Sequence, residues 1–355
     1  MERIELPTHG RGATGNPTNR FEQISYERGD DDAIDDSPSP RTTFYKDTAR
    51  SVITTNDSPD LYFDASLNPY RGCEHGCIYC YARPYHEYLG LSAGLDFETK
   101  IFVKEDAPEL LRGDLMRRSW KPQTLMLSGV TDPYQPIERR LKLTRRCLEV
   151  LVEFRNPVAV ITKNRLIARD ADLLAELARH GAGTATLAVT TLDADLANVM
   201  EPRASTPTAR LEAIRELTAA GVPTGVLIAP VIPGLTDHEI PAILKAAREA
   251  GAVQAGFVML RLPHGVKELF ETWLEQHFPE KKEKVLGRVR DMRGGKLNDS
   301  HFGTRMKGEG PMAELIAQVF ETTKRRLGFP GKKTLSASAF HRPGETALSL
   351  FNEAS

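Results

Sequence analysis

The chain has 355 residues, of which 40% are hydrophobic and 27% charged, and its formal net charge is −1. This composition is typical of a globular protein with one large or two ordinary domains, and it excludes a uniformly basic polyanion binder. No apolar run approaches the roughly 18 residues of a membrane span, and the first residues lack the apolar core of a secretion signal. We therefore expect a cytoplasmic protein with no membrane partner.

The first 60 residues differ in composition from the rest of the chain. They are rich in Gly, Pro, Asp, Asn, Ser and Thr, show little periodicity, and include the acidic stretch 27–36. Such a segment cannot bury much apolar surface. The sequence therefore predicts an extended or partly disordered arm over residues 1–60.

Between residues 61 and 262, short apolar runs alternate with segments of helical periodicity. Apolar strands separated by amphipathic helices that end at glycine are typical of parallel β/α units. The sequence therefore predicts an α/β fold, a partial (β/α)6 barrel of the TIM-like kind. The predicted strands are 67–72, 124–129, 158–163, 184–191, 223–231 and 255–260, and the helices between them include 141–154, 168–180, 207–221 and 237–251.

Residues 263–330 read as a C-terminal helical extension that caps the barrel, and residues 331–355 as a tail. A Gly-rich loop at 300–311 interrupts the helices, and Asp299, Ser300 and Arg305 flank it, facing either a ligand or the open edge of the barrel. From residue 261 onward there are 17 Lys and Arg against 12 Asp and Glu. This mild excess is compatible with an ordinary solvated surface or with contacts to phosphates.

Three of the four cysteines lie within eight residues, in the stretch RGCEHGCIYCYAR at 71–83. Their spacing is Cys73-x3-Cys77-x2-Cys80, and they follow the first predicted strand, where a β/α barrel carries its catalytic loops. A disulfide framework is not expected from so few cysteines in a reducing compartment. The cluster is therefore a candidate metal site.

Three ligand sets are compatible with this spacing. A zinc site needs four ligands, and His75 or His86 is a candidate for the fourth. A four-thiol iron–sulfur cluster would need Cys147, which falls instead on an apolar helical face with Leu148 and Leu151. In the third set, three thiolates hold three irons of a 4Fe-4S cluster and leave the fourth iron open to a ligand.

The cysteine motif, with an aromatic residue, Tyr79, directly before its last cysteine, resembles the radical S-adenosylmethionine (SAM) superfamily. The resemblance implies a 4Fe-4S cluster on Cys73, Cys77 and Cys80, with SAM bound to the open iron. It also implies reductive cleavage of SAM to methionine and a 5'-deoxyadenosyl radical that abstracts hydrogen from a substrate. An electron donor such as flavodoxin or ferredoxin would then be a partner.

Further stretches resemble the spore photoproduct lyase-like subgroup, also called DNA repair photolyase-like, which makes DNA a candidate substrate. That lyase uses a cysteine after its second strand and tyrosines in its C-terminal part. Here residues 128–133 read SGVTDP and no tyrosine follows Tyr134, so we do not expect dimer repair itself. The stretches that carry the resemblance are 67–83, 129–138, 160–164, 189–204 and 228–237.

The resemblance also implies which residues bind SAM. Lys163 would supply a cation for the carboxylate, and Thr190 a hydroxyl for the same groups. The set is completed by Tyr79 in the motif, by Ser128, Gly129 and Asp132 at the position of the methionine amino group, and by Ala229 and Pro230 beside the adenine.

Plainer interpretations exist for several of these positions. Lys163 could cap a helix or be solvated, Thr190 could reflect β-propensity alone, and Asp132 could serve an ordinary turn. Glu201 and Arg203, in the stretch EPRA, follow the fourth predicted strand closely enough to face the cavity or to pair with each other, and pairing is the favoured interpretation. For the whole chain, the alternative is a non-catalytic iron–sulfur or zinc-binding interaction protein on a barrel scaffold.

Overall fold

The computed structural model describes residues 10–21, 40–331 and 334–344. Its main sheet has seven strands in the order β10-β9-β8-β7-β6-β3-β2. Its strands β3, β6, β7, β8, β9 and β10 are parallel to one another, and β2 pairs antiparallel with β3. The sheet is open, so the predicted α/β partial barrel of six parallel strands is confirmed. Its strands are β2 (Ile53–Thr55), β3 (Ala65–Leu67), β6 (Leu125–Leu127), β7 (Val158–Thr162), β8 (Gly183–Ala188), β9 (Thr224–Val231) and β10 (Gln254–Met259).

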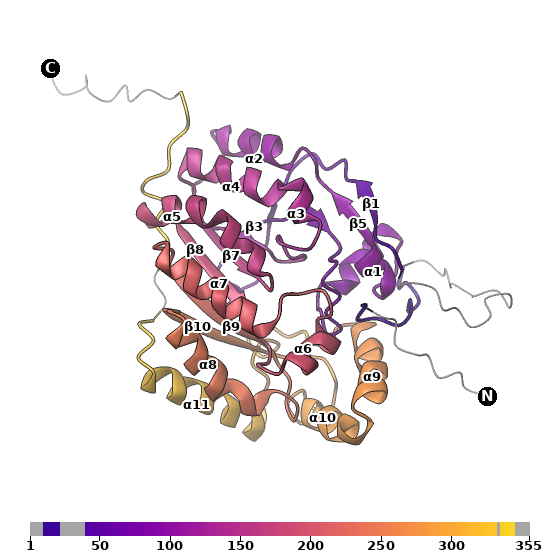
Figure 1. Ribbon diagram of the computed structural model, residues 1–355. Coiled ribbons are helices and arrows are strands. Elements are labelled where there is room, and N and C mark those ends of the chain that lie inside the picture. The colour runs from indigo at the N-terminus through magenta and orange to yellow at the C-terminus, as the bar shows by residue number, and fades with distance from the viewer. Residues whose placement is uncertain (1–9, 22–39, 332–333, 345–355) are drawn as a thin grey trace, which may run out of the picture.

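Helices follow the parallel strands and cover the outer side of the sheet (Figure 1). The longer ones are α2 (Ala107–Met116), α4 (Leu143–Phe154), α5 (Ala171–Arg179), α7 (Pro207–Ala219) and α8 (Ile240–Glu249). The shorter ones are α1 (Leu95–Thr99), α3 (Glu138–Leu141), α6 (Ala194–Met200) and the 3-10 helices η1 (Arg83–Leu89), η2 (Arg165–Asp170) and η3 (Asp237–Glu239). In the C-terminal part, α9 (Val266–His277), α10 (Pro279–Asp291) and α11 (Gly310–Arg326) lie along the lower edge in Figure 1.

Local sequence signals set the ends of these helices. At α7, the Thr206 side chain accepts a hydrogen bond from the Ala209 N–H, and Pro207 occupies the first turn. Past α7 and α8, Gly221 and Gly251 adopt φ values of 87° and 105°, which residues with a side chain rarely adopt. The predicted glycine stops are therefore used as expected.

The first predicted strand, 67–72, is divided in the structure. Residues 65–67 form β3 of the main sheet, whereas β4 (Tyr70–Arg71) belongs to a separate small sheet with β1 (Thr43–Lys46) and β5 (Lys100–Val103). Pro69 lies between them and has no N–H to continue a ladder, which explains the break. The prediction of one continuous strand was wrong at this point.

The described parts of the N-terminal and C-terminal segments pack on the barrel. Arg11, Ala13 and Asn19 are buried, and residues 43–46 and 53–55 form strands. At the other end, the Ser336 N–H donates to Gly181 O. The acidic stretch 27–36 and the end of the tail, 345–355, lie outside the described residues.

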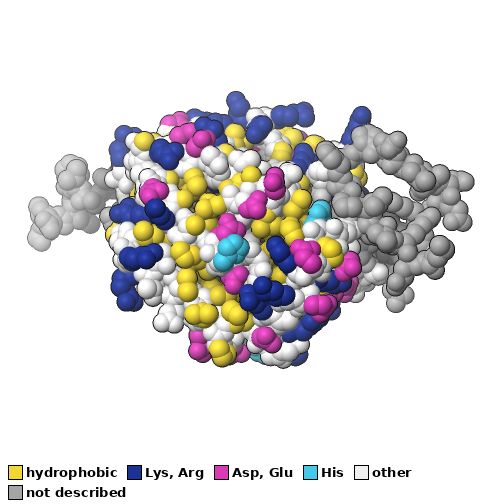
Figure 2. All heavy atoms as spheres, turned by 60° about the horizontal axis from the view of Figure 1, so that its bottom comes forward, with side chains coloured by type: hydrophobic (Ala, Val, Ile, Leu, Met, Phe, Trp, Pro, Cys, Tyr) yellow, Lys and Arg dark blue, Asp and Glu magenta, His cyan; other side chains and the backbone are white. Residues whose placement is uncertain are grey.

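No helix within the described ranges is both long enough and apolar enough to cross a membrane. Figure 2 turns the lower side of Figure 1 forward, where α9, α10 and α11 lie. On this face Lys and Arg side chains are interspersed with Asp, Glu and apolar side chains (Figure 2). Several of the basic residues are paired, as Lys282 is with Glu275 and Arg288 with Asp237. These contacts give the C-terminal helices a mixed surface.

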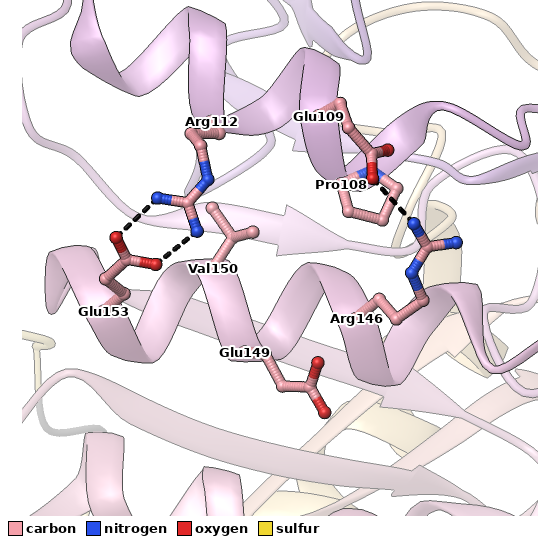
Figure 3. A pocket seen from close by; sticks show the side chains of 7 residues that line it. All are labelled: Pro108, Glu109, Arg112, Arg146, Glu149, Val150 and Glu153. Carbon is pink, nitrogen blue, oxygen red and sulfur yellow. Dashed lines mark hydrogen bonds and ion pairs between the residues drawn. The ribbon is translucent and has the colours of Figure 1, made fainter.

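A small pocket of about 220 Å³ lies between α2 and α4 (Figure 3). Its charged side chains face one another across the two helices: Arg112 pairs with Glu153, and Arg146 pairs with Glu109 at 2.7 Å. These are exposed ion pairs, which contribute at most about 1 kcal/mol each. The pocket is accounted for by this helix–helix contact.

Candidate metal and cofactor site

The three clustered cysteines lie on one loop, residues 72–82, which we call the cysteine loop. Cys73 and Cys77 are buried and Cys80 is partly buried. The backbone fixes the loop on two sides, because the Cys73 N–H donates to Phe97 O at 2.9 Å and the Ile78 N–H donates to Met200 O at 3.0 Å. The thiols are therefore presented by an ordered loop.

Burial raises the pKa of all three thiols above the usual value. The charge of Lys163 acts in the opposite direction on Cys77 and Cys80. Such thiols need a positive group before they ionise, and the irons of a cluster supply that charge. The donor set of three thiols on one ordered loop fits a 4Fe-4S cluster with one open iron.

Among the described residues, no group of three or more His, Cys, Asp and Glu side chains is placed to hold a metal ion. A cluster does not require such convergence, since each thiolate binds a different iron. The two histidines considered for zinc have other partners. His86 Nε2 lies 2.9 Å from Lys100 O, and His75 Nε2 lies 3.1 Å from the Asn164 side-chain amide nitrogen.

Cys147 is a fully buried residue of the main core, on α4 with Leu148 and Leu151. Burial raises the pKa of its thiol, as expected for a small apolar core residue. The cysteine loop packs against other apolar clusters. The prediction that Cys147 is a core residue separate from the three motif cysteines is confirmed.

A buried ion pair supports the cysteine loop from behind. Nη2 of the fully buried Arg83 donates to Glu98 at 2.5 Å and to Gly76 O at 3.3 Å, and its Nε donates to Cys77 O at 3.0 Å. Glu98 also accepts from the N–H groups of Gly12 (3.1 Å) and Ala13 (2.9 Å). The N-terminal stretch GRGATG is thereby tied to the backbone that carries Cys77.

Replacing Gly12 with alanine is expected to disturb this support, because a Cβ at position 12 would lie 1.7 Å from Gly76 O. Backbone has to shift to relieve such a contact, so we expect a loss of roughly 1–3 kcal/mol in the free energy of unfolding. Iron incorporation on reconstitution should fall as well. The control is Gly113→Ala on α2, where a Cβ meets nothing within 4 Å. Equal stability and iron content in the two variants would contradict the prediction.

Four residues predicted to bind SAM lie together, three of them at the carboxyl ends of parallel strands and Tyr79 on the cysteine loop. Lys163 Nζ donates to Thr190 Oγ1 (3.1 Å) and to Ala229 O (2.9 Å), and lies 5.5 Å from the centre of the Tyr79 ring. Tyr79 OH lies 3.2 Å from Thr190 Oγ1. Burial, and then the charge of Arg210, lower the pKa of Lys163 to about 8. A set far apart in sequence therefore becomes one polar cluster beside Cys77.

Glu201 is the centre of this cluster, although sequence reasoning paired it with Arg203. One of its oxygens lies 3.0 Å from Lys163 Nζ and accepts from Tyr79 OH, and the other accepts from Arg210. Arg203 pairs instead with Glu74 at 3.1 Å. The expected pairing was wrong, because position along the chain does not show that Arg210, on the next helix, is buried toward the same carboxylate.

Asp132 holds the cysteine loop and the end of β7 together. Its carboxylate accepts from Thr162 Oγ1 (2.6 Å) and the Lys163 N–H (2.8 Å), and lies 3.4 Å from His75 Nδ1. Although burial alone would raise its pKa, His75 and these donors lower it. Asp132 thus positions Lys163, while a direct contact with the methionine amino group stays a prediction.

The other predicted residues lie along the same edge of the sheet. Ser128 and Gly129 follow β6 with φ values of 147° and 129°, and Gly129 O accepts from Tyr81 OH. Ala229 and Pro230 lie inside β9, and Pro230 is buried. The structure thus places every predicted residue at the carboxyl ends of β6, β7, β8 and β9 or on the cysteine loop.

Two exposed aromatic rings and two partly buried arginines form a group next to Cys80, and sequence reasoning singled out only one of its members, Arg305. Arg261, just after β10, lies over the Tyr81 ring at 5.3 Å, and Arg305 lies over the Phe302 ring at 4.6 Å. Arg305 also pairs with Asp60 at 2.5 Å. We call Tyr81, Arg261, Phe302 and Arg305 the aromatic–arginine cluster. Tyr81, Arg261 and Phe302 are single residues in different loops, so no pattern in the sequence indicated that they meet Arg305.

His86 behind the loop predicts a pH dependence of stability. Burial lowers the pKa of His86 to about 4, against 6.5 for an unperturbed histidine. The folded state therefore holds this imidazole neutral, and the unfolded state binds the extra proton. The contribution of neutral His86 to the free energy of unfolding is therefore fully present above pH 6.5. It is lost as the pH falls from 6.5 toward 4, by at most about 3 kcal/mol. Unfolding of His86→Gln between pH 7.5 and 4.5 should show a weaker pH dependence than the unaltered chain; an unchanged slope would assign the effect elsewhere.

Comparison with known proteins supports one family. Residues 67–247 match the model of the radical SAM superfamily. An uncharacterised protein of Mycobacterium tuberculosis is 35% identical over 67% of this chain and 71% of its own length. A radical SAM Nalpha-GlyT isomerase of Pseudomonas phage M6 is 27% identical over 56% of this chain and 40% of its own length.

Solved structures of spore photoproduct lyase share the fold. A complex with a dinucleoside spore photoproduct gives a TM-score of 0.57 at 17% identity, covering 81% of this chain and 80% of the lyase. A mutant with bound AdoMet and the dinucleoside gives 0.54 at 18% identity, covering 78% and 77%. With the family match spanning half of the sequence, the chain belongs to the radical SAM superfamily.

Proposed function

We propose that this protein is a radical SAM enzyme whose 4Fe-4S cluster is held by Cys73, Cys77 and Cys80. The observation that carries the proposal is the placement of these three thiols on one ordered loop, beside the polar cluster of Lys163, Thr190 and Glu201. A bound cluster would supply the electron that cleaves SAM into methionine and a 5'-deoxyadenosyl radical for hydrogen abstraction. Residues 61–262 would carry this chemistry, and 263–330 would cap the barrel.

The chain's own residues have distinct duties in this proposal. The ammonium group of Lys163 donates to Thr190 Oγ1 and Ala229 O and pairs with the Glu201 carboxylate. It is therefore already oriented at the strand ends. Its positive charge would receive the carboxylate of SAM in exchange for part of this bonding. Tyr79 would fix one side of the site through its ring contact with Lys163.

The test is the release of 5'-deoxyadenosine from SAM by anaerobically reconstituted protein under reduction. A brown protein with broad absorbance near ~400 nm that releases this product supports the proposal. A colourless protein that cleaves no SAM would favour the alternative, a non-catalytic metal-binding protein. A reducing, cytoplasmic setting belongs to the same proposal, because all four cysteines are free thiols.

For the substrate, we favour a nucleic acid. The aromatic–arginine cluster carries this finer proposal, because an exposed ring beside Cys80 with a guanidinium over it suits a stacked base and its phosphate. Tyr81 is 44% exposed and Phe302 is 56% exposed, so both rings are accessible. The dinucleoside bound in the related lyase fold is compatible with such a ligand.

Replacing Tyr81 with alanine is expected to weaken binding of a single-stranded DNA oligonucleotide by about 5- to 100-fold, the range for loss of one stacked base. Fluorescence anisotropy at low salt measures this. The matched control is Tyr45→Ala on β1, a comparably exposed ring that stacks on Phe102 at 5.2 Å. Equal affinities in both variants, or no binding by the unaltered protein, would move the substrate toward a peptide or metabolite.

A further inference from the structure

A second charged feature lies on the other flank of the cysteine loop, at Glu74. It is an open groove of about 600 Å³, which we call the arginine groove. Four arginines line it, together with one carboxylate and one exposed ring: Arg11, Arg41, Arg140, Arg203, Glu74 and Phe44. Neither the SAM site nor the aromatic–arginine cluster uses these side chains.

The groove carries more positive charge than its own carboxylate can offset. Glu74 is almost fully used within the protein, since it accepts from Arg203 (3.1 Å), Thr42 Oγ1 (3.1 Å) and the Ile137 N–H (2.8 Å). Arg41 and Arg140 are exposed, and neither pairs with a carboxylate among the described residues. An anionic partner is therefore the complement of this surface.

Arg11 adds a positive charge to the groove that forms no ion pair with a carboxylate among the described residues. The residue is only 8% exposed, and its terminal nitrogens donate to Glu98 O (3.1 Å), to Pro40 O and to Thr42 Oγ1 (3.2 Å). Burial lowers the pKa of Arg11, and the charge of Arg203 lowers it further. The guanidinium groups of Arg11 and Arg203 are thus close enough for their charges to repel, and an anion bound in the groove would offset this repulsion.

The groove is also next to the candidate cluster. Glu74 directly follows Cys73, and the Arg203 N–H donates to His75 O at 3.3 Å, so the cysteine loop forms one wall. Phe44, 39% exposed, offers an apolar contact among the arginines. Interfaces between electron-transfer proteins are small, the complexes are transient, and opposite charges steer their formation.

We propose that the arginine groove is the docking surface for an acidic one-electron donor protein of the flavodoxin class. This inference rests on the proposed function, which requires such a donor. In the encounter, the donor is oxidised by one electron and the iron–sulfur group on Cys73, Cys77 and Cys80 is reduced by one electron, with no atom transferred. The short path through Glu74 and Cys73 is what makes this flank suited to electron entry.

The first experiment measures binding alone. The variant is the double charge reversal Arg41→Glu/Arg140→Glu, and the control is Arg215→Glu/Lys245→Glu on α7 and α8, which changes the net charge equally. Calorimetric titration with a purified flavodoxin at low and high salt should show an affinity at least about tenfold lower for the groove variant, with a weaker salt dependence. Unchanged affinity, or an equal loss in the control, would overturn the proposal.

The second experiment separates electron entry from catalysis. Release of 5'-deoxyadenosine should fall in the groove variant when flavodoxin, its reductase and NADPH supply electrons, and should be unchanged with photoreduced deazaflavin, a small uncharged reductant. If the unaltered protein releases none with deazaflavin, the proposed function fails, whereas the titration still decides the docking surface. If the groove variant loses oligonucleotide binding and keeps flavodoxin binding, the groove is a nucleic-acid surface and the donor proposal is overturned.

Discussion

Replacing Cys73, Cys77 or Cys80 with alanine, one at a time, is expected to abolish both iron binding and cleavage of SAM. Each thiol would hold a separate iron, and no cysteine in the described chain outside the loop lies beside it to take over, since Cys147 is in the main core. Iron content, the absorbance near ~400 nm and 5'-deoxyadenosine release should all fall to the level of a protein-free control.

The matched control for these variants is Cys147→Ala. It removes a sulfur from a fully buried site, so a loss of roughly 1 kcal/mol in the free energy of unfolding is expected, with cluster and SAM cleavage retained. Loss of the cluster in this variant would restore the four-thiol alternative. A loop-cysteine variant that still binds iron at full stoichiometry would show that the assigned ligand set is incorrect.

Replacing Glu201 with glutamine is expected to destabilise the fold by about 3–5 kcal/mol, the range for breaking a buried ion pair. The substitution keeps the size of the side chain but leaves the charges of Lys163 and Arg210 without their shared counter-ion. Without this carboxylate the pKa of Lys163 would fall further below its usual value, so Lys163 would lose its positive charge more readily. Chemical unfolding of the unloaded protein measures the loss of stability. Titration with SAM measures the loss of affinity that follows if Lys163 is less often charged.

The control for Glu201 is Glu212→Gln on α7. Glu212 pairs with Arg165 at 3.0 Å, but both side chains are nearly half exposed, so the expected cost is at most about 1 kcal/mol. If Glu201→Gln were no more destabilising than this control, the buried cluster would not depend on the carboxylate. If it folds normally and binds SAM with unchanged affinity, the charge on Lys163 does not depend on Glu201.

The fold followed from signals that repeat along the chain. Alternating apolar runs, helical periodicity and glycine stops predicted the six parallel strands, because burial on both faces and helix termination are local requirements. The prediction failed where a single residue altered the pattern, as Pro69 does between β3 and β4. The small sheet of β1, β4 and β5 was missed because its strands have two to four residues each.

By itself, the sequence determined the cysteine motif, the order of the β/α units and the strand-end positions of Lys163 and Thr190. These depend on spacing and periodicity, which are written along the chain. Only the tertiary structure decided that Glu201 joins Lys163 and that Arg203 turns to Glu74. It also decided that Gly12 braces the cysteine loop through Glu98. Charge pairing and close backbone contact depend on distances between segments far apart in sequence, which local patterns do not carry.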